Sequence, residues 1–487
     1  MEYILVIDVG TSGIRGSILD RRGGILACGK REYRPESDEY GRVEQDADDF
    51  LKQLDALLEL AGRECAARGI SLSAVSVTSQ RSSVIPVDRE GKPLGPAIMW
   101  LDRRSQSICR EINGRFDIYP LCGMTARPVF SGPKILWMKQ NLPELYGQAA
   151  KLIGFHELVL HRLTGNFVTD TSVASRSALL DIHTLEWSEP LLELFGVERR
   201  KLCGLIAPGT AAGNISGPAG RLLGCGAIPV ISAGGDQQCA ALGMGMVEPG
   251  ILCANLGTGA YTTLLCDRVV LDPCRKVFCN GSAIPGKWLL ETSSRASGMV
   301  YDWVKGQFFE GCGAEEMNRQ AEQAGPGAHS LLMLPYLLDS GEMSGGAFLN
   351  IGVHTVKGDF ARAALEALAG EIWECLQTQR KFAGTINQLV CAGGLSRSRL
   401  YNQILADTCN VPIEVQRQRE ATTAGAFMSA AVALGLQQNL KAAWRGICGG
   451  TDLYLPDREK HEYYMEIHRR RRELFLAISR PERRGES

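Results

Sequence analysis

The pattern of apolar and polar positions is clearest at the start of the chain, where an apolar run over residues 4–7 ends at Asp8. A turn of small residues follows at 10–13, and a second, mostly apolar run leads away over 14–19. This pattern predicts two β-strands joined by a short hairpin. The tip of such a hairpin exposes backbone N–H groups and hydroxyls to an anion. Asp8, at the end of the first strand, could hold a hydrated Mg²⁺ against that anion.

The same arrangement returns at residues 250–265, where Gly257-Thr258-Gly259 separates two apolar runs. A single turn of this kind is more typical of an ordinary hairpin, because short motifs often arise by chance. Two such turns in one chain, the first preceded by an aspartate, favour phosphate binding. Together they indicate two related domains that hold one nucleotide.

Helical and strand patterns alternate along the rest of the chain, which is typical of an α/β fold. The predicted helices are 46–68, 359–382, 421–434 and 462–478, and the predicted strands are 25–33, 74–78, 84–88, 228–233, 388–392 and 411–415. Residues 103–215 are predicted to be mostly helical. A chain of 487 residues exceeds what one core usually serves, so we expect two domains, residues 1–245 and 246–487.

Composition and charge narrow the function classes. The chain is 45% hydrophobic and 22% charged, and its net charge of −1 gives no reason to expect nucleic-acid or membrane binding. No apolar run approaches the roughly 18 residues of a membrane-spanning helix. The chain has 16 cysteines without a Cys-x-x-Cys pair, which favours buried thiols in a reducing compartment over a zinc site. Because the N-terminus carries no secretory signal, we expect a cytoplasmic protein.

A second candidate for chemistry is Gly234-Gly235-Asp236, where a predicted strand stops at two glycines and a helix begins. One interpretation is that Asp236 is only an N-cap residue, a common use of aspartate. The other is that the glycines let a substrate approach the backbone and that Asp236 accepts a proton from a substrate hydroxyl. The two interpretations are compatible, because the helix dipole keeps an aspartate at this position ionised.

A third glycine turn, Gly393-Gly394, lies between a predicted strand and a predicted helix. It is either a plain βα loop or a binding surface for adenine and ribose, where only glycine permits close approach. The turn does not fit G-x-G-x-x-G, and no segment fits G-x-x-x-x-G-K-[ST]. The sequence therefore disfavours both a Rossmann enzyme and a P-loop NTPase.

Taken in order, these motifs resemble those of the FGGY carbohydrate kinase family, which sits in the superfamily of actin, the heat-shock chaperone ATPases and hexokinase. In chain order they are Asp8-Val9-Gly10-Thr11-Ser12, Gln80-Arg81, Trp100-Leu101-Asp102-Arg103-Arg104, Gly235-Asp236-Gln237-Gln238, Gly257-Thr258-Gly259 and Gly393-Gly394. Each is modest alone, but the ordered set is specific. The resemblance runs from Tyr3 to about Leu474.

The resemblance implies an α/β protein of two ribonuclease H-like domains around a deep cleft. A small sugar or polyol would bind mainly to the first domain and ATP with Mg²⁺ between the two, and a homodimer is the assembly that we expect. Asp236 would be the general base and, with Asp8, would place Mg²⁺. The other implied contacts are Arg81, Trp100 and Gln237 for the sugar, Thr11, Ser12, Arg15, Gly257 and Thr258 for the phosphates, and Gly298, Gly394 and Ser398 for the nucleoside.

Three segments bear on the substrate. The Gly-Asp-Gln-Gln and Trp100 segments look most like glycerol kinases, yet Ser82 stands where those enzymes carry glutamate, and Val129 where they carry tyrosine. Residues 283–288 resemble xylulokinases, so we favour a ketose or polyol of four to six carbons over glycerol. Glycerol kinase, an actin- or chaperone-like ATPase without a sugar substrate, and a catalytically dead sugar sensor remain alternatives. Trp100 could also be a core aromatic, and Arg81 a surface ion-pair partner.

Overall fold

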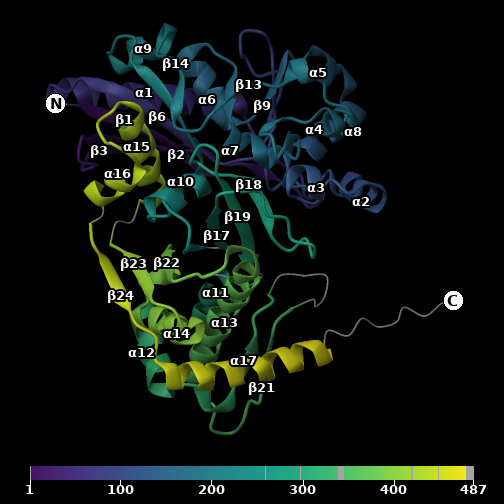
Figure 1. Cartoon of the computed structure of the whole chain (residues 1–487), viewed down its shortest axis with the longest axis vertical. Coiled ribbons are helices and arrows are strands. Elements are labelled where there is room, and N and C mark those ends of the chain that lie inside the picture. The colour runs from purple at the N-terminus through teal and green to yellow at the C-terminus, as the bar shows by residue number, and fades with distance from the viewer. Residues whose placement is uncertain are drawn as a thin grey trace. The chain divides into compact units, whose positions relative to one another are not determined.

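The computed structural model describes residues 2–257, 259–294, 296, 298–337, 345–417, 420–447 and 449–478 (Figure 1). The chain divides into two compact units. The first consists of Met1–Val247, Leu265–Leu290 and Glu420–Cys448, and the second of Glu248–Leu264, Glu291–Arg419 and Gly449–Ser487. The first unit thus takes up two segments from the later part of the chain.

The first unit is built on a six-stranded sheet of order β14-β15-β6-β1-β2-β3. Its strands are β1 (Tyr3–Val9), β2 (Gly13–Asp20), β3 (Ile25–Glu32), β6 (Leu72–Ser79), β14 (Thr210–Asn214) and β15 (Pro229–Gly235). The predicted hairpin is confirmed, since β1 and β2 pair antiparallel from Tyr3↔Asp20 to Val9↔Ile14. β1, β6 and β15 run parallel, so their carboxyl ends meet at one edge of the sheet.

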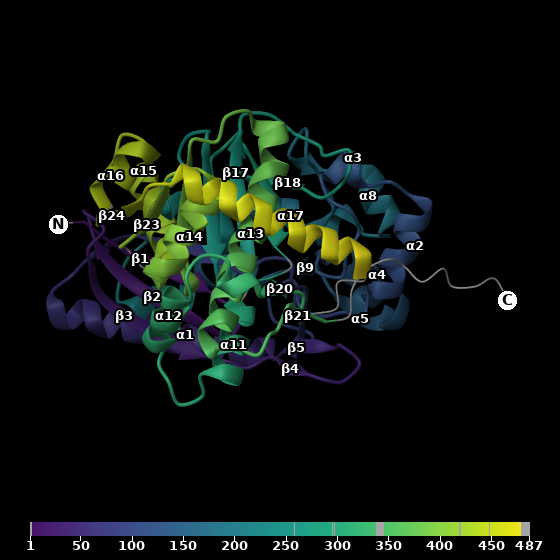
Figure 2. The ribbon, with the colours of Figure 1, turned by 90° about the horizontal axis from the view of Figure 1, so that it is seen from below.

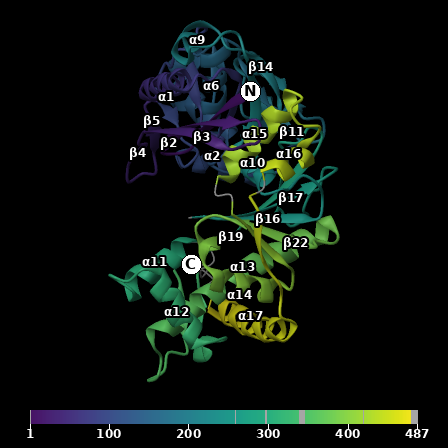
Figure 3. The ribbon, with the colours of Figure 1, turned by 90° about the vertical axis from the view of Figure 1, so that its left-hand side faces the viewer.

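Helices cover both faces of this sheet because the strands are apolar on both sides. Leu5 and Ile7 face a core shared with α1 (Ala47–Arg68), α6 (Phe155–Thr164) and α9 (Gly217–Leu223). Ile4 and Val6 face the opposite core, which α10 (Asp236–Gly243) and α15 (Ala421–Ala433) complete. Figure 3 shows α15 and α16 (Leu440–Ile447) beside α10.

Two glycines let α10 and α15 pack with their backbones in contact. A Cβ on Gly243 would lie 1.9 Å from the carbonyl oxygen of Ala421, and a Cβ on Gly425 would lie 1.9 Å from that of Cys239. The helix at 421–433 is therefore part of the first unit, although in the chain it lies between two segments of the second unit.

The region predicted to be mostly helical contains the expected helices and also several short strands. The helices are α2 (Gln106–Arg115), α3 (Tyr119–Cys122), α4 (Ser131–Asn141), α5 (Pro143–Gln148), α7 (Thr171–Ala174) and α8 (Glu189–Leu194).

The short strands of the first unit, inside and outside this region, are β4 (Glu36–Ser37), β5 (Val43–Gln45), β7 (Ile85–Val87), β8 (Ala97–Ile98), β9 (Lys151–Ile153), β10 (Val168–Asp170), β11 (Leu180–Asp181), β12 (Glu186–Trp187), β13 (Gly204–Ile206) and β18 (Phe278–Gly281).

The second unit repeats the central motif of the first. Its neighbouring strands run in the order β17-β16-β22-β23-β24, with β16 antiparallel to β17 and parallel to β22. The bounds are β16 (Ile251–Leu256), β17 (Ala260–Cys266), β19 (Trp288–Ser294), β22 (Gln388–Ala392), β23 (Ile413–Gln416) and β24 (Thr451–Tyr454). The second predicted hairpin is confirmed, but Thr258 at its tip lies outside the described residues.

Helices of the second unit pack around the long α13 (Lys357–Ala383). The others are α11 (Gly298–Phe308), α12 (Ala314–Ala324), α14 (Arg399–Cys409) and α17 (Arg458–Ile478). The strands β20 (Leu332–Leu334) and β21 (Ala347–Leu349) pair antiparallel. Figure 2 shows α17 lying across α13 and α14. None of the helices among the described residues combines the length and apolar character needed to cross a membrane.

Candidate active site

Three segments that the sequence singled out come together where β1, β6 and β15 end. Arg81 follows β6, and Asp236 follows β15 as the first residue of α10. The Nε of Arg81 lies 3.3 Å from Oδ1 of Asp236, and the backbone N–H of Gln237 donates to the same oxygen at 2.8 Å. Arg81 is thus an ion-pair partner of the candidate base rather than of a surface residue.

Asp236 is not the N-cap of α10, because Gly235 occupies that position. The carboxylate stands in the first turn of the helix, where the helix dipole favours a negative charge. The interpretation of Asp236 as only a capping residue is therefore wrong.

The two glycines before Asp236 are required by their surroundings. Gly234 has a φ of +118°, in a region that side chains disfavour, and a Cβ there would lie 2.7 Å from Oγ of Ser172. A Cβ on Gly235 would lie 2.5 Å from Cδ of Arg81. Oε1 of Gln238 would also lie 2.5 Å from a Cβ on Gly235, so the two glycines make room for the side chains of Ser172, Arg81 and Gln238.

Asp8 lies near the same carboxylate. Burial of the Asp8 side chain, and then the negative charge of Asp236, raise the pKa of Asp8 to about 7, while the nearby Arg15 opposes the shift. Arg15 is directly opposite Asp8 in the hairpin and forms an ion pair with Glu420, at the start of α15. Glu420 was not predicted from the sequence, because no local motif marks it.

These carboxylates suit Mg²⁺. Two acidic groups close enough to raise a pKa are stabilised by a divalent cation, and carboxylate oxygens are ligands that Mg²⁺ prefers. Among the described residues, no group of three or more His, Cys, Asp or Glu side chains could hold a metal ion by itself. In the usual Mg²⁺ site, one or two carboxylates act together with phosphates and water.

The hairpin tip is held in shape by groups around it. The backbone N–H of Gly10 donates to the carbonyl of Gly13 at 2.9 Å, and the Tyr33 hydroxyl donates to the carbonyl of Gly10 at 2.5 Å. The indole N–H of Trp100 donates to the Thr11 hydroxyl at 3.0 Å, so this tryptophan supports the tip. Trp100 is half-buried. Ser12 is exposed at the tip.

In the second unit, two of the expected nucleotide residues are hydrogen-bonded to each other. The backbone N–H of Gly298 donates to the carbonyl of Gly257 at 3.1 Å. Gly394 lines a pocket of about 380 Å³ together with Arg417 and Tyr454. Ser398 does not line this pocket, and its hydroxyl instead accepts from the backbone N–H of Tyr401 as the cap of α14.

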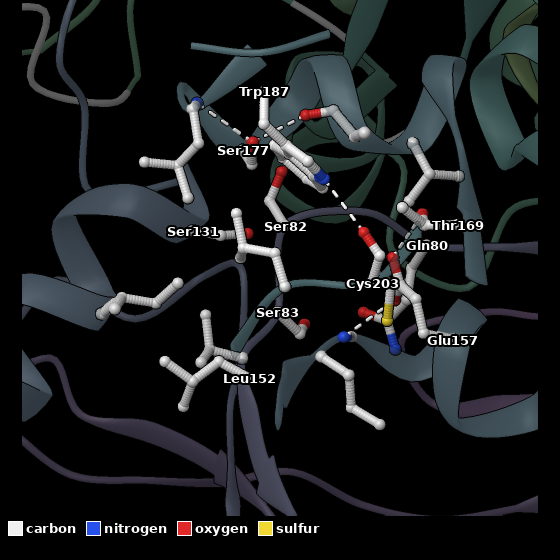
Figure 4. A pocket seen from close by; sticks show the side chains of 18 residues that line it. Gln80, Ser82, Ser83, Ser131, Leu152, Glu157, Thr169, Ser177, Trp187 and Cys203 are labelled. Atoms are coloured by element: carbon white, nitrogen blue, oxygen red, sulfur yellow. Dashed lines mark hydrogen bonds between the residues drawn. The ribbon is translucent and has the colours of Figure 1, made fainter. Parts of the chain in front are cut away.

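Ser82, which stands where glycerol kinases carry glutamate, is held in place by local contacts. Ser82 has a φ of +71°, is buried, and donates its hydroxyl to the carbonyl of Arg176 at 2.9 Å. It lines a cavity of about 50 Å³, where the hydroxyls of Ser83, Ser131 and Ser177 also gather (Figure 4). The Ser82 side chain is therefore fixed within the first unit.

Val129 lies in a segment that a buried lysine holds. Nζ of Lys134, in α4, donates to the carbonyls of Pro128 at 2.6 Å, Val129 at 2.7 Å and Phe130 at 3.2 Å. Lys134 is 1% exposed, and burial lowers its pKa to about 7. Sequence reasoning missed Lys134, although a lysine on the apolar side of a short helix was a signal for it.

Comparison with known proteins gives a consistent result over the whole chain. The model of the N-terminal domain of the FGGY family of carbohydrate kinases matches residues 3–243, and that of the C-terminal domain matches 253–434. The chain is 26% identical to a xylulose kinase of Lactococcus lactis subsp. lactis (98% of this chain, 97% of that protein). It is 29% identical to a glycerol kinase of Brucella ovis (94% and 96%). The crystal structure of ligand-bound xylulose kinase from Lactobacillus acidophilus matches with a TM-score of 0.92 at 25% identity and 99% coverage of both chains.

Proposed function

Because the chain belongs to the FGGY family of carbohydrate kinases, we propose that it phosphorylates a hydroxyl of a four- to six-carbon ketose or polyol, with Asp236 as the general base. Family membership makes the protein an ATP-dependent phosphotransferase that acts on a small sugar or polyol. The choice of substrate within that class and the roles of individual residues are what we propose.

The observation that carries it is the pairing of Arg81 with Asp236 at the strand ends. An alcohol is a poor nucleophile, and a carboxylate that accepts its proton contributes typically ~10²–10⁴-fold to the rate. Arg81 keeps the carboxylate ionised and in one orientation, so that it can accept the proton as the oxygen attacks the phosphoryl group.

Asp8 and Asp236 are the groups that would hold Mg²⁺, which supplies positive charge to the transferred phosphoryl group. Thr11, Ser12 and Arg15 of the first hairpin, and Gly257 and Thr258 of the second, are proposed phosphate contacts. Gly298, Gly394 and Ser398 are proposed to border the nucleoside. The cap formed by Ser398 supports an indirect role for it, through the start of α14.

The preference for a longer substrate rests on positions 82 and 129. The buried Ser82 hydroxyl is bonded to a backbone carbonyl, and Val129 offers no hydrogen bond to a substrate. These two positions therefore offer fewer groups that match the hydroxyls of a three-carbon ligand, and a site that does not match a substrate hydroxyl discriminates against it. Arg81, Trp100 and Gln237 are the proposed sugar contacts.

Substrate screening tests this proposal. The purified full chain is given MgATP and, separately, glycerol, erythritol, D- and L-xylulose, D- and L-ribulose, fructose and gluconate, and ADP release is measured. We expect a ketose or longer polyol to give the highest kcat/KM, and glycerol to be poor. Glycerol as the best substrate would overturn the argument from Ser82 and Val129. ATP hydrolysis that no sugar stimulates would favour the actin- or chaperone-like alternative.

The homodimer stays a prediction, which light scattering can test.

A further inference from the structure

A fully buried aspartate joins two serines behind the candidate base. Asp170 ends β10 and caps α7 by accepting from the backbone N–H groups of Ser172 and Val173. Its Oδ1 also accepts from the hydroxyl of Ser172 at 2.5 Å, and its Oδ2 accepts from the hydroxyl of Ser232 at 2.6 Å. Asp170 and both serines are 0% exposed.

A buried histidine completes this group. Nε2 of His156 lies 2.7 Å from Oγ of Ser232 and 3.3 Å from Oδ2 of Asp170. Burial alone would raise the pKa of Asp170, but the hydrogen bonds from His156, Ser172 and Ser232 bring that pKa below its ordinary value. Asp170 is therefore an ionised and strongly held acceptor for both serine hydroxyls.

The two serines differ in what else they contact. Ser172 Oγ accepts from the backbone N–H of Gly235 at 3.2 Å, and it is the atom 2.7 Å from the place of a Cβ on Gly234. The carbonyl of Ser172 accepts from the side-chain amide of Gln238 at 3.2 Å. Ser172 thus touches the two residues before Asp236 and one residue after it.

The direction of the Ser172 hydroxyl follows from its partners. A serine hydroxyl has one hydrogen to donate, and here the hydrogen points to Asp170. The oxygen lone pairs are then available for the N–H of Gly235. Two successive glycines are otherwise the most flexible backbone that could precede a catalytic group.

We propose that Asp170 and Ser172 are positioning residues for Asp236: they hold the Gly234-Gly235 backbone so that the carboxylate keeps its place beside Arg81. This inference rests on the proposed function, since it concerns the group assigned there as the base. Displacement of a reacting group by about 1 Å can cost roughly 10²-fold in rate, so a backbone hydrogen bond next to the base has a kinetic effect.

The alternative is that the group only satisfies buried polar atoms and stabilises the fold. Ser232 provides the matched control, because it donates to the same carboxylate, is equally buried and lies in β15, but its hydroxyl bonds to Asp170 and His156 rather than to the backbone of Gly235. Ser172→Ala and Ser232→Ala each remove one hydroxyl from Asp170. Only Ser172→Ala also releases the N–H of Gly235.

Steady-state kinetics of the full chain, with the best sugar from the substrate screen, separate the two possibilities. We expect Ser172→Ala to lower kcat roughly tenfold or more with little change in either KM, and Ser232→Ala to lower kcat less than threefold, while both lower Tm by similar amounts. Asp170→Asn keeps the shape of the side chain but replaces the carboxylate that accepts from the Ser172 hydroxyl. Its kcat should therefore fall as in Ser172→Ala. Equal kcat values for the two serine variants would overturn the proposal.

Amide hydrogen exchange gives a readout without turnover. We expect the backbone over residues 233–237 to exchange faster in Ser172→Ala than in the wild type, and to be unchanged in Ser232→Ala. If the wild type released no ADP with any sugar, the proposed function would fail while exchange still reported on the backbone. Unchanged exchange in Ser172→Ala would by itself contradict the positioning role.

Discussion

The side chain of Arg81 occupies the space that any side chain at Gly235 would need. Cδ of Arg81 would lie 2.5 Å, and Cγ 2.9 Å, from a Cβ on Gly235. The same side chain places its Nε 3.3 Å from the carboxylate of Asp236. Gly235 is therefore what allows the arginine to cross the strand end and reach the candidate base.

Gly235→Ala should displace both Arg81 and the side-chain amide of Gln238, whose Oε1 lies as close to the new Cβ, and should weaken the ion pair of Arg81 with Asp236. We expect kcat/KM for the sugar to fall about tenfold or more, with KM for ATP less affected, because the disturbed arginine is a proposed sugar contact. Gly446→Ala is the control, since a Cβ there meets only ordinary contacts in α16. Unchanged sugar kinetics in Gly235→Ala would argue against Arg81 as part of the sugar site.

Asp236→Asn tests the general base. The amide keeps the shape of the side chain but cannot accept the proton, so kcat should fall roughly 10²-fold or more while the KM for sugar stays close to the wild-type value. The control is Asp267→Asn, an exposed carboxylate paired with Lys287. A variant that kept the wild-type kcat would remove Asp236 from the chemistry.

Asp8→Ala tests the proposed metal site. Burial, and then the negative charge of Asp236, raise the pKa of Asp8, and loss of this carboxylate should leave Mg²⁺ without one of its two proposed ligands. We expect MgATP-dependent ADP release to be lost at ordinary Mg²⁺ concentrations. Asp20→Ala, at the far end of β2, should keep activity. Full activity in Asp8→Ala would mean that the first hairpin does not serve the phosphates.

The parts of the site that could be predicted from the sequence are those that lie in one short segment. An apolar run that stops at an aspartate and a glycine turn specifies a strand end locally, as at Asp8 and Gly235. Parallel pairing of β1, β6 and β15 then brings the strand ends together. The chemistry at that edge was therefore readable in the order of the motifs.

The residues that sequence reasoning missed act across the fold. Glu420 pairs with Arg15 from 405 positions away, because α15 packs back against α10 of the first unit through Gly425. Ser172 reaches Gly235 from a four-residue helix with no motif of its own. Such pairings depend on the packing of distant segments, which no local pattern encodes.

The contact between α10 and α15 makes Gly425 a test of the first unit. A Cβ at 425 would lie 1.9 Å from the carbonyl oxygen of Cys239, and backbone atoms cannot move aside cheaply. We expect Gly425→Ala to lower stability by about 3 kcal/mol, visible as a clear drop in Tm. Gly446→Ala, in the neighbouring helix, should change Tm little. Equal Tm values for the two variants would contradict this helix contact.

Lys134 offers a test of pH dependence. Burial lowers its pKa from 10.5 to about 7, while its Nζ donates to three successive carbonyls. Above pH 7 the folded chain carries a neutral amine at this position, which keeps two N–H donors for the three carbonyls, whereas the unfolded chain keeps the proton up to about pH 10.5. The unfolded state then binds more protons, so the free energy of unfolding rises with pH in this window. Below pH 7 both states are protonated, and this group contributes no slope.

Lys134→Met removes the titrating amine and with it this slope. We therefore expect the stability of the wild type relative to Lys134→Met to increase by about 2 kcal/mol between pH 7 and pH 9, and to be flat between pH 5 and pH 6. Urea unfolding of both proteins across that range measures the difference, in which other titrating groups cancel. Lys139→Met, an exposed lysine on the same helix, should show no such trend. A wild-type advantage that stayed constant from pH 5 to pH 9 would mean that the pKa of Lys134 is not lowered into this range.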